Sequence, residues 1–294
     1  NRMKRGKSRR LFKKKKSHSN QRLGCIIAII VLIPICYGLY LYYQQYSVQH
    51  SSKPQIETSV SLPTPSGKDL EIPVSLIPRQ EQIIRHKGYT VSYNKDLKIP
   101  NWVSYELTRQ ETKGKEKRGD NFIADPLVKG AIATNADYAR SGYDKGHMAP
   151  AADMKWSPDV MKESFYFSNM CPQHPQLNRR GWKNLEEKIR DWAVADSAII
   201  IICGPIIDKP SKTIGKNKVA VPERFFKVIL SPFVKPARGI GFLFNNRQAV
   251  EPLSTYAVSI DSIEKLTHMD FFSPLPDEIE NAVEANADYY QWPR

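Results

Sequence analysis

Cysteine is scarce in this chain of 294 residues, which contains only four. Two of them, Cys25 and Cys36, lie inside an apolar run, and the other two are Cys171 and Cys203. No CxxC or nearby histidine pair is present, which argues against a zinc site built on these cysteines. A disulfide between Cys171 and Cys203 is allowed if this part of the chain is exported, and the sequence leaves their pairing open.

Acidic residues are absent from the first 23 positions, which hold eleven of the 44 Lys and Arg residues. Residues 24–294 therefore contain 33 basic and 30 acidic residues, a net of +3 out of the formal +14. The basic character belongs to the tail and does not indicate that the rest of the chain binds nucleic acid. We predict that residues 1–23 form a basic cytoplasmic tail.

Charge is also absent from residues 24–43 (GCIIAIIVLIPICYGLYLYY), an apolar run of twenty residues. As a helix this run is long enough to cross a hydrocarbon core of about 30 Å, and tyrosines crowd its far end. The alternatives are a cleaved signal peptide and a buried core helix, but the run is longer than a typical signal-peptide core. We predict an uncleaved transmembrane anchor. The positive-inside rule then places the remainder outside the cytoplasm, in the periplasm or at the cell surface.

The exported part divides into two regions by composition. Residues 44–81 are rich in Ser, Pro and Thr and predict a stalk or linker, while residues 82–294 predict one folded domain. Within it, residues 88–94 and 102–108 alternate in polarity as an antiparallel strand pair would. Apolar runs at 197–202, 225–230 and 240–244 predict further strands, and 259–266 and 277–287 predict helices. The charged segment 111–120 is expected to be an exposed loop.

Residues 141–191 concentrate the groups that can do chemistry. His147 follows the small Gly146, so a substrate can approach its imidazole, which makes it a candidate general base. Residues 163–170 (ESFYFSNM) predict a strand that delivers Asn169 to a turn at the prolines that follow. A histidine alone is more often structural, so the function of His147 depends on its neighbours.

A helix is predicted over residues 179–194, because Trp182, Leu185, Ile189 and Trp192 share helical spacing. Glu186 and Arg190 lie at the edge of this apolar face, either as functional groups or as a surface ion pair. Asn178 precedes the helix, where it is either an N-cap or a ligand beside the positive end of the helix dipole. Amide and carboxylate oxygens suit a hard cation such as Mg²⁺.

The joint pattern resembles the DNA/RNA non-specific endonucleases of the ββα-metal superfamily. The resemblance rests on motifs that occur in order over roughly residues 89–294: Asp144-Lys145-Gly146-His147, Met148-Ala149-Pro150, Ser168-Asn169, Pro172-Gln173, Leu177-Asn178, Gly181-Trp182 and Leu185-Glu186. It implies an α+β fold in which a mostly antiparallel sheet is flanked by helices, here preceded by one N-terminal transmembrane helix.

The same resemblance implies a role for each site residue. His147 would be the general base, Asn178 the direct ligand of Mg²⁺ (with Mn²⁺ as an alternative), and Glu186 the group that orients metal-bound water. Arg190, with Asp144 and Lys145, would contact the substrate phosphate, and Asn169 would support the histidine. The substrates would be DNA and RNA, and a homodimer is an expected assembly.

Lys145 departs from the family motif, which has arginine at this position. Lysine keeps the positive charge but lacks the planar two-pronged guanidinium, which predicts a slower rate within the same reaction class. Two other functions stay open at this stage. One is a phosphodiesterase of the same fold that acts on nucleotides or another polymer, and the other is an inactive nucleic-acid-binding protein.

Overall fold

The computed structural model describes residues 67–207 and 212–294, which belong to a compact unit spanning Pro63–Arg294. The predicted basic tail 1–23, the transmembrane anchor 24–43 and most of the linker 44–81 lie outside the described residues. Within the part of the chain that is described, no helix has the length and apolarity needed to span a bilayer.

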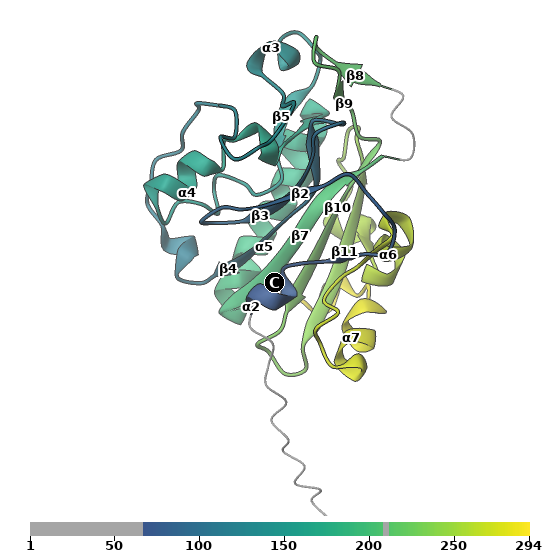
Figure 1. Ribbon diagram of the computed structural model, residues 1–294. Coiled ribbons are helices and arrows are strands. Elements are labelled where there is room, and N and C mark those ends of the chain that lie inside the picture. Colours follow the sequence, from purple (N-terminus) through teal and green to yellow (C-terminus); the bar gives the residue numbers. More distant parts are fainter. Residues whose placement is uncertain (1–66, 208–211) are drawn as a thin grey trace, which may run out of the picture. The chain divides into compact units, whose positions relative to one another are not determined.

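The centre of the unit is a seven-stranded sheet in the order β12-β11-β10-β7-β4-β3-β2, in which every neighbouring pair is antiparallel (Figure 1). The strands are β2 (Gln82–Arg85), β3 (Thr90–Asn94), β4 (Ile99–Thr108), β7 (Ala198–Ile206), β10 (Arg224–Ser231), β11 (Arg238–Asn245) and β12 (Ala257–Val258). The predicted antiparallel pair at 88–94 and 102–108, and the three later strands, are confirmed. So is the α+β class with a mostly antiparallel sheet.

Helices cover both faces of the sheet, and β7 shows how the sequence requires this. Its four consecutive isoleucines are all fully buried. Successive side chains of a strand point to opposite faces of the sheet, so both faces must be covered. Ile199 and Ile201 belong to the core on the face of α5 (Lys183–Asp196). Ile200 and Ile202 belong to the core that includes residues of α6 (Ile260–Thr267) and α7 (Asp277–Glu284).

A ββα unit lies beside the sheet and carries the motif residues. Strands β5 (Asp144–His147) and β6 (Met170–Gln173) pair antiparallel, and a π-helical turn, η3 (Leu177–Trp182), leads directly into α5. The predicted helix over 179–194 is confirmed, but Asn178 is not its N-cap, because it lies inside the π-helical turn.

The predicted strand at 163–170 is wrong. Glu163 ends α4 (Pro158–Glu163), and Phe167–Asn169 forms a 3-10 turn, η2, before β6 begins. Aromatic residues spaced two apart fit a buried 3-10 turn as well as a strand, so the alternation was ambiguous. The predicted turn at the prolines is also wrong, since Pro172 lies within β6 opposite Lys145. A strand in a two-stranded ribbon tolerates proline because one of its edges has no partner.

Smaller elements close the unit, and part of the predicted linker joins it. Leu70 of α2 (Gly67–Leu70) is fully buried, and β1 (Val74–Ser75) pairs with β13 (Met269–Asp270). Ser259 caps α6 by accepting from the Ser262 N–H. The remaining elements are α3 (Asn135–Tyr138), β8 (Thr213–Ile214), β9 (Val219–Ala220) and the 3-10 turns Glu111–Lys113, Leu253–Tyr256 and Tyr289–Gln291.

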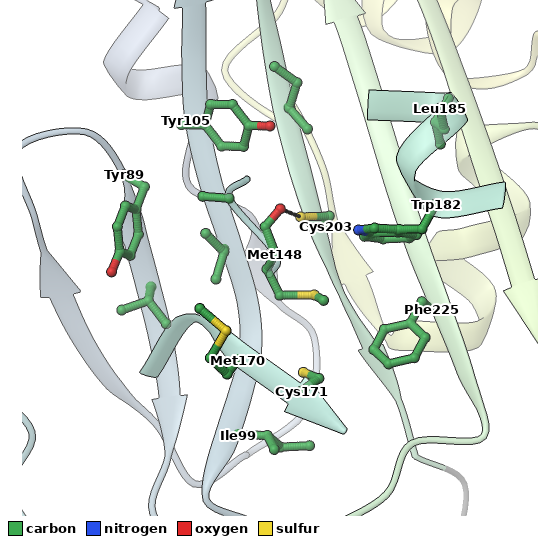
Figure 2. Packing of buried hydrophobic residues seen from close by; sticks show 14 of the residues in the cluster. Tyr89, Ile99, Tyr105, Met148, Met170, Cys171, Trp182, Leu185, Cys203 and Phe225 are labelled. Carbon is green, nitrogen blue, oxygen red and sulfur yellow. Dashed lines mark hydrogen bonds between the residues drawn. The ribbon is translucent and has the colours of Figure 1, made fainter. Parts of the chain in front are cut away.

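Cys171 and Cys203 are both free and buried, so no disulfide joins them. They lie in the core between the ββα unit and the sheet, where the Cys203 thiol donates to the Met148 carbonyl at 3.2 Å (Figure 2). Burial raises the pKa of Cys203 to about 11, so this thiol packs as a small apolar group. Met148 follows His147 directly, so the sheet supports the backbone of the candidate site.

Candidate active site

The ββα unit opens onto a cleft of about 460 Å³. Five of the residues predicted from sequence line it together: Lys145, His147, Asn178, Glu186 and Arg190. The two others, Asp144 and Asn169, do not line it and act on their neighbours instead. Arg118, Arg179 and Lys183 add three further cations to the lining.

His147 is buried, with 7% of its surface exposed, and its Nε2 atom has no hydrogen-bond partner among the described residues. Its ring packs edge-on against Phe165 at a centroid distance of 5.0 Å and lies 5.6 Å from the ring of Phe122. Burial, followed by the positive charges of Arg118 and Lys145, lowers the pKa of His147 to about 3. The imidazole is therefore neutral at physiological pH, with a nitrogen lone pair available to accept a proton.

The backbone around His147 is held from two sides. The indole N–H of Trp182 donates to the His147 carbonyl at 3.2 Å. The fully buried Asn169 side chain accepts from the Ala149 N–H and donates to the carbonyls of Ala149 and Ser164, each at 2.8 Å. Asn169 thus fixes the chain two residues after the histidine and does not reach the cleft.

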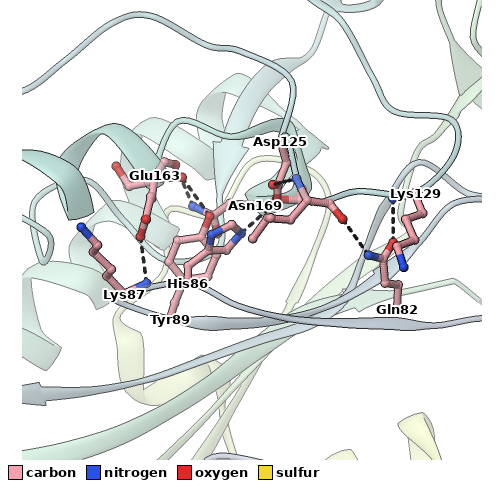
Figure 3. Close-up of polar contacts among 11 residues, drawn as sticks. Gln82, His86, Lys87, Tyr89, Asp125, Lys129, Glu163 and Asn169 are labelled. Carbon is pink, nitrogen blue, oxygen red and sulfur yellow. Dashed lines mark hydrogen bonds and ion pairs between the residues drawn. The ribbon is translucent and has the colours of Figure 1, made fainter.

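Asp125 fixes the 3-10 turn that carries Asn169 (Figure 3). Its buried carboxylate accepts from the Ser168 hydroxyl at 2.6 Å, lies 2.9 Å from His86 Nε2 and accepts from the Leu127 N–H at 2.9 Å. Burial acts to raise the pKa of Asp125, but these hydrogen bonds outweigh it and hold the pKa below its ordinary value. The network explains how a turn without regular pairing presents Asn169 rigidly.

Asp144 orients Asn178. The Asn178 amide N–H donates to the Asp144 carboxylate at 3.0 Å, and Arg179 binds both oxygens of the same carboxylate at 2.8 Å. Because the amide nitrogen faces Asp144, the amide oxygen of Asn178 is left for the cleft that this residue lines. The π-helical turn places Asn178 opposite β5, which a regular helix start would not ensure.

Glu186 lies one turn into α5 and lines the cleft from the helix side. Burial, opposed by Lys227 and reinforced by the nearby Asp153, raises the pKa of Glu186 to about 7. A carboxylate held in a poorly solvated place is costly when charged, and a bound cation removes that cost.

Arg190 does not pair with Glu186 as an i,i+4 surface pair would. Its guanidinium donates to the buried Asp153 carboxylate at 2.7 Å, and Tyr105 donates to the other Asp153 oxygen at 2.8 Å. Arg190 is half-buried and keeps one side in the cleft. The bond to Asp153 thus fixes the positively charged guanidinium of Arg190 beside Glu186.

Lys145 is held in place by two contacts. Its ammonium group lies 4.3 Å from the centroid of the Phe122 ring and donates to Asn135 Oδ1 at 3.0 Å. Gly146, which follows Lys145, is required by packing, because a Cβ at this position would lie 2.6 Å from the Cβ of Gln173 on β6. Each residue of the DKGH motif thus has its own part. Asp144 orients Asn178, Lys145 supplies a positive charge, Gly146 allows β5 to pack closely on Gln173, and His147 lines the cleft.

Several site residues were not found from sequence. Arg118 lies in the segment expected to be only an exposed loop, and nothing in its local pattern distinguishes it. Asp153 and Lys227 form a charged layer beneath Glu186, and Lys227 is fully buried in β10 with its ammonium 4.4 Å from the Trp182 ring centroid. A lysine inside the apolar run 225–230 was the available signal.

Comparison with known proteins identifies the family of this chain. The DNA/RNA non-specific endonuclease family matches residues 66–278. A nuclease of Nostoc sp. is 30% identical over 250 residues, which cover 80% of this chain and 88% of that protein. Mitochondrial endonuclease G of Homo sapiens is 33% identical over 213 residues, covering 66% of this chain and 71% of that protein.

A solved structure, that of the EndoG/EndoGI complex, which concerns the mechanism of EndoG inhibition, is also similar. The TM-score is 0.63 at 29% sequence identity, and the match covers 68% of this chain and 89% of that one. The family match extends over more than half of the chain and includes every motif residue named above. The chain therefore belongs to the DNA/RNA non-specific endonuclease family, whose members are hydrolytic nucleases.

Proposed function

We propose that this chain is a metal-dependent, sugar-non-specific endonuclease that hydrolyses phosphodiester bonds of DNA and RNA with His147 as the general base. The observation that carries the proposal is the neutral His147, whose Nε2 atom is unpartnered among the described residues and which shares a cleft with Asn178, Glu186 and several cations. An inactive binding protein would have no need to keep a buried imidazole nitrogen unpaired at a cost in stability.

Two residues of the cleft fit a hard divalent cation, for which we propose Mg²⁺ or Mn²⁺. Asn178 offers an amide oxygen because its nitrogen is engaged by Asp144. Glu186 offers a carboxylate whose raised pKa marks an unsatisfied preference for a positive partner. When bound, the cation would supply Lewis-acid stabilisation of the negative charge that develops on the reacting phosphate.

The chain's own residues supply the remaining chemistry. His147 accepts the proton of the attacking water through a ring nitrogen, and the negative phosphate opposes the effects of Arg118 and Lys145 that lower its pKa in the free protein. Lys145 and Arg190 hold the phosphate from two sides of the cleft, each fixed by its own partner, Asn135 and Asp153. Contacts of this kind recognise the backbone and not the base, which suits a non-specific nuclease.

The proposal also covers location and assembly. The uncharged run at 24–43 and the eleven basic residues before it support a membrane-anchored protein with a cytoplasmic N-terminus and an extracytoplasmic nuclease domain. Protease added to intact cells should then remove the domain without permeabilisation. We also propose a homodimer, which size-exclusion chromatography with light scattering tests directly.

The function is tested by incubating the full chain with plasmid DNA, with RNA and with a dinucleotide, in Mg²⁺ and in EDTA. We expect cleavage of both polymers in Mg²⁺ and none in EDTA. Asn178→Ala should abolish cleavage, whereas Asn184→Ala, an exposed asparagine on α5, should not. Cleavage of the dinucleotide without cleavage of either polymer would favour a phosphodiesterase. Folded protein that cuts nothing would favour the binding protein.

A further inference from the structure

Five carboxylates gather on the face of the sheet opposite the candidate active site. Asp261 and Glu264 belong to α6, Asp270 to β13, and Glu280 and Glu284 to α7. They form two overlapping groups of three, and in each group one oxygen from every carboxylate lies within 4.8 Å of the others. Glu284 belongs to both groups, so it is the centre of the cluster.

Glu284 is the least accessible member. Only 7% of its surface is exposed, and its Oε1 atom is buried without a hydrogen-bond partner among the described residues. It is the last residue of α7, where the helix dipole disfavours a negative charge. The helix packs closely on β11 next to this residue, since a Cβ on Gly239 would lie 2.5 Å from the Val283 carbonyl oxygen.

The protein supplies no cation to this cluster within residues 67–207 and 212–294, where none of the five carboxylates forms an ion pair with Lys, Arg or His. Burial, followed by the charges of Glu264 and Glu280, raises the pKa of Glu284 to about 9. Burial is also the main cause that raises the pKa values of Glu264, Asp270 and Glu280. A buried oxygen in such surroundings requires a positive ligand or a proton.

We propose that Glu284, Asp261, Glu264, Asp270 and Glu280 form a structural site for a divalent cation of the calcium type. Ca²⁺ takes six to eight oxygen ligands in flexible geometry, including carboxylates that bind through one or both oxygens, whereas Mg²⁺ demands a near-ideal octahedron and retains several waters. An irregular set of five carboxylates from three elements fits the first ion better.

The site would join β13, α6 and α7 through one ion. Asp270 lies on β13, which pairs with β1, so the ion would connect the beginning of the domain to α6 and α7. Bound Ca²⁺ would therefore stabilise the layer that covers the second face of the sheet. This inference is independent of the proposed nuclease function, because none of its residues lines the catalytic cleft.

Thermal unfolding of the full chain tests the site, with CaCl2, MgCl2 or EDTA as the only additions. At a Ca²⁺ concentration about 100-fold above its Kd, the Tm of the wild-type protein should rise by roughly 5 °C or more, with a smaller rise in Mg²⁺. Glu284→Gln should lose the Ca²⁺-dependent rise and, in EDTA, should melt above the wild type, because the wild type must take up a proton at Glu284 on folding and glutamine need not. Glu278→Gln, an exposed acid on the same helix, should behave as wild type.

Calorimetric titration with CaCl2 gives the direct measurement. A Ca²⁺ site that persists in Asn178→Ala and disappears in Glu284→Gln supports the proposal, since Asn178 belongs to the other cleft. If Glu284→Gln does not fold, Glu280→Gln takes its place and should weaken Ca²⁺ binding at least tenfold. Unchanged Tm in Ca²⁺, or a Ca²⁺ response that survives Glu284→Gln, would overturn the proposal and leave a cluster held by protons. Nuclease activity of Glu284→Gln in Mg²⁺ should remain that of the wild type.

Discussion

Glu186→Gln should stabilise the metal-free protein and at the same time abolish its proposed activity. The folded state raises the pKa of Glu186 from an ordinary 4.5 to about 7, with burial as the main cause. The folded state therefore holds the proton more tightly than the unfolded state, so stability falls as the pH rises through this window. At about 1.4 kcal/mol for each pH unit, the charged form costs the folded state on the order of 3 kcal/mol at pH 8.

Glutamine removes this cost because it is neutral at every pH. We expect Glu186→Gln to gain about 1–3 kcal/mol in the free energy of unfolding at pH 8, after allowance for local relaxation, and only a small part of that at pH 5. Chemical denaturation in EDTA at both pH values measures the gain. Asp191→Asn, an exposed acid on the same helix, should change stability by less than about 0.5 kcal/mol.

The pH dependence distinguishes this account from simpler ones. A better-packed glutamine would stabilise the protein equally at pH 5 and pH 8, so a gain independent of pH would refute the electrostatic argument. Lower stability of Glu186→Gln at pH 8 would also refute it, because it would mean that Lys227 and Arg190 outweigh burial. In Mg²⁺ the order should reverse, since only the wild type keeps the carboxylate that we propose faces the cation and its bound water.

Three further predictions follow from the site. Cleavage should need more Mg²⁺ as the pH falls from 8 to 6, by about tenfold for each pH unit below 7. The reason is that Glu186 takes up a proton over this range, while His147, with a pKa of about 3, stays neutral. An Mg²⁺ requirement that does not change with pH would contradict this. Asp144→Asn should raise the Mg²⁺ concentration for half-maximal activity by roughly 10–100-fold, because Asn178 loses its charged partner; a titration of activity with Mg²⁺ measures it. Gly146→Ala should lower stability by about 1–3 kcal/mol in urea, because its Cβ would meet Gln173, and an unchanged urea midpoint would show that β6 yields easily.

The sheet was predictable because its pattern is strong. Four consecutive isoleucines indicate a strand buried on both faces, and the alternation of polar and apolar residues at 88–94 indicates a second strand. The turn that carries Asn169 was not predictable, because its geometry comes from a hydrogen-bond network around Asp125, some forty residues earlier in the chain. Local pattern contains no information about such a distant partner.

The candidate site likewise has parts that the sequence predicts and parts that it does not. The spacing of Trp182, Leu185 and Ile189 placed Glu186 and Arg190 correctly on the edge of α5. The partner of Arg190 was missed because Asp153 reaches it across the fold from a loop without a sequence signature. Asn178 was expected at a helix start, but its position in a π-helical turn is set by the contact with Asp144, which only the pairing of β5 and β6 makes possible.

The central claim is that His147 removes the proton from water, and a comparison of two histidines tests it most directly. Plasmid cleavage in Mg²⁺ by the full chain should fall by at least about 100-fold in His147→Ala. His174→Ala is the matched control, since His174 lies just before the π-helical turn and is absent from the cleft lining, and it should retain activity near wild type. Cleavage that survives His147→Ala in folded protein would contradict the account, because it would show that His147 is not the general base.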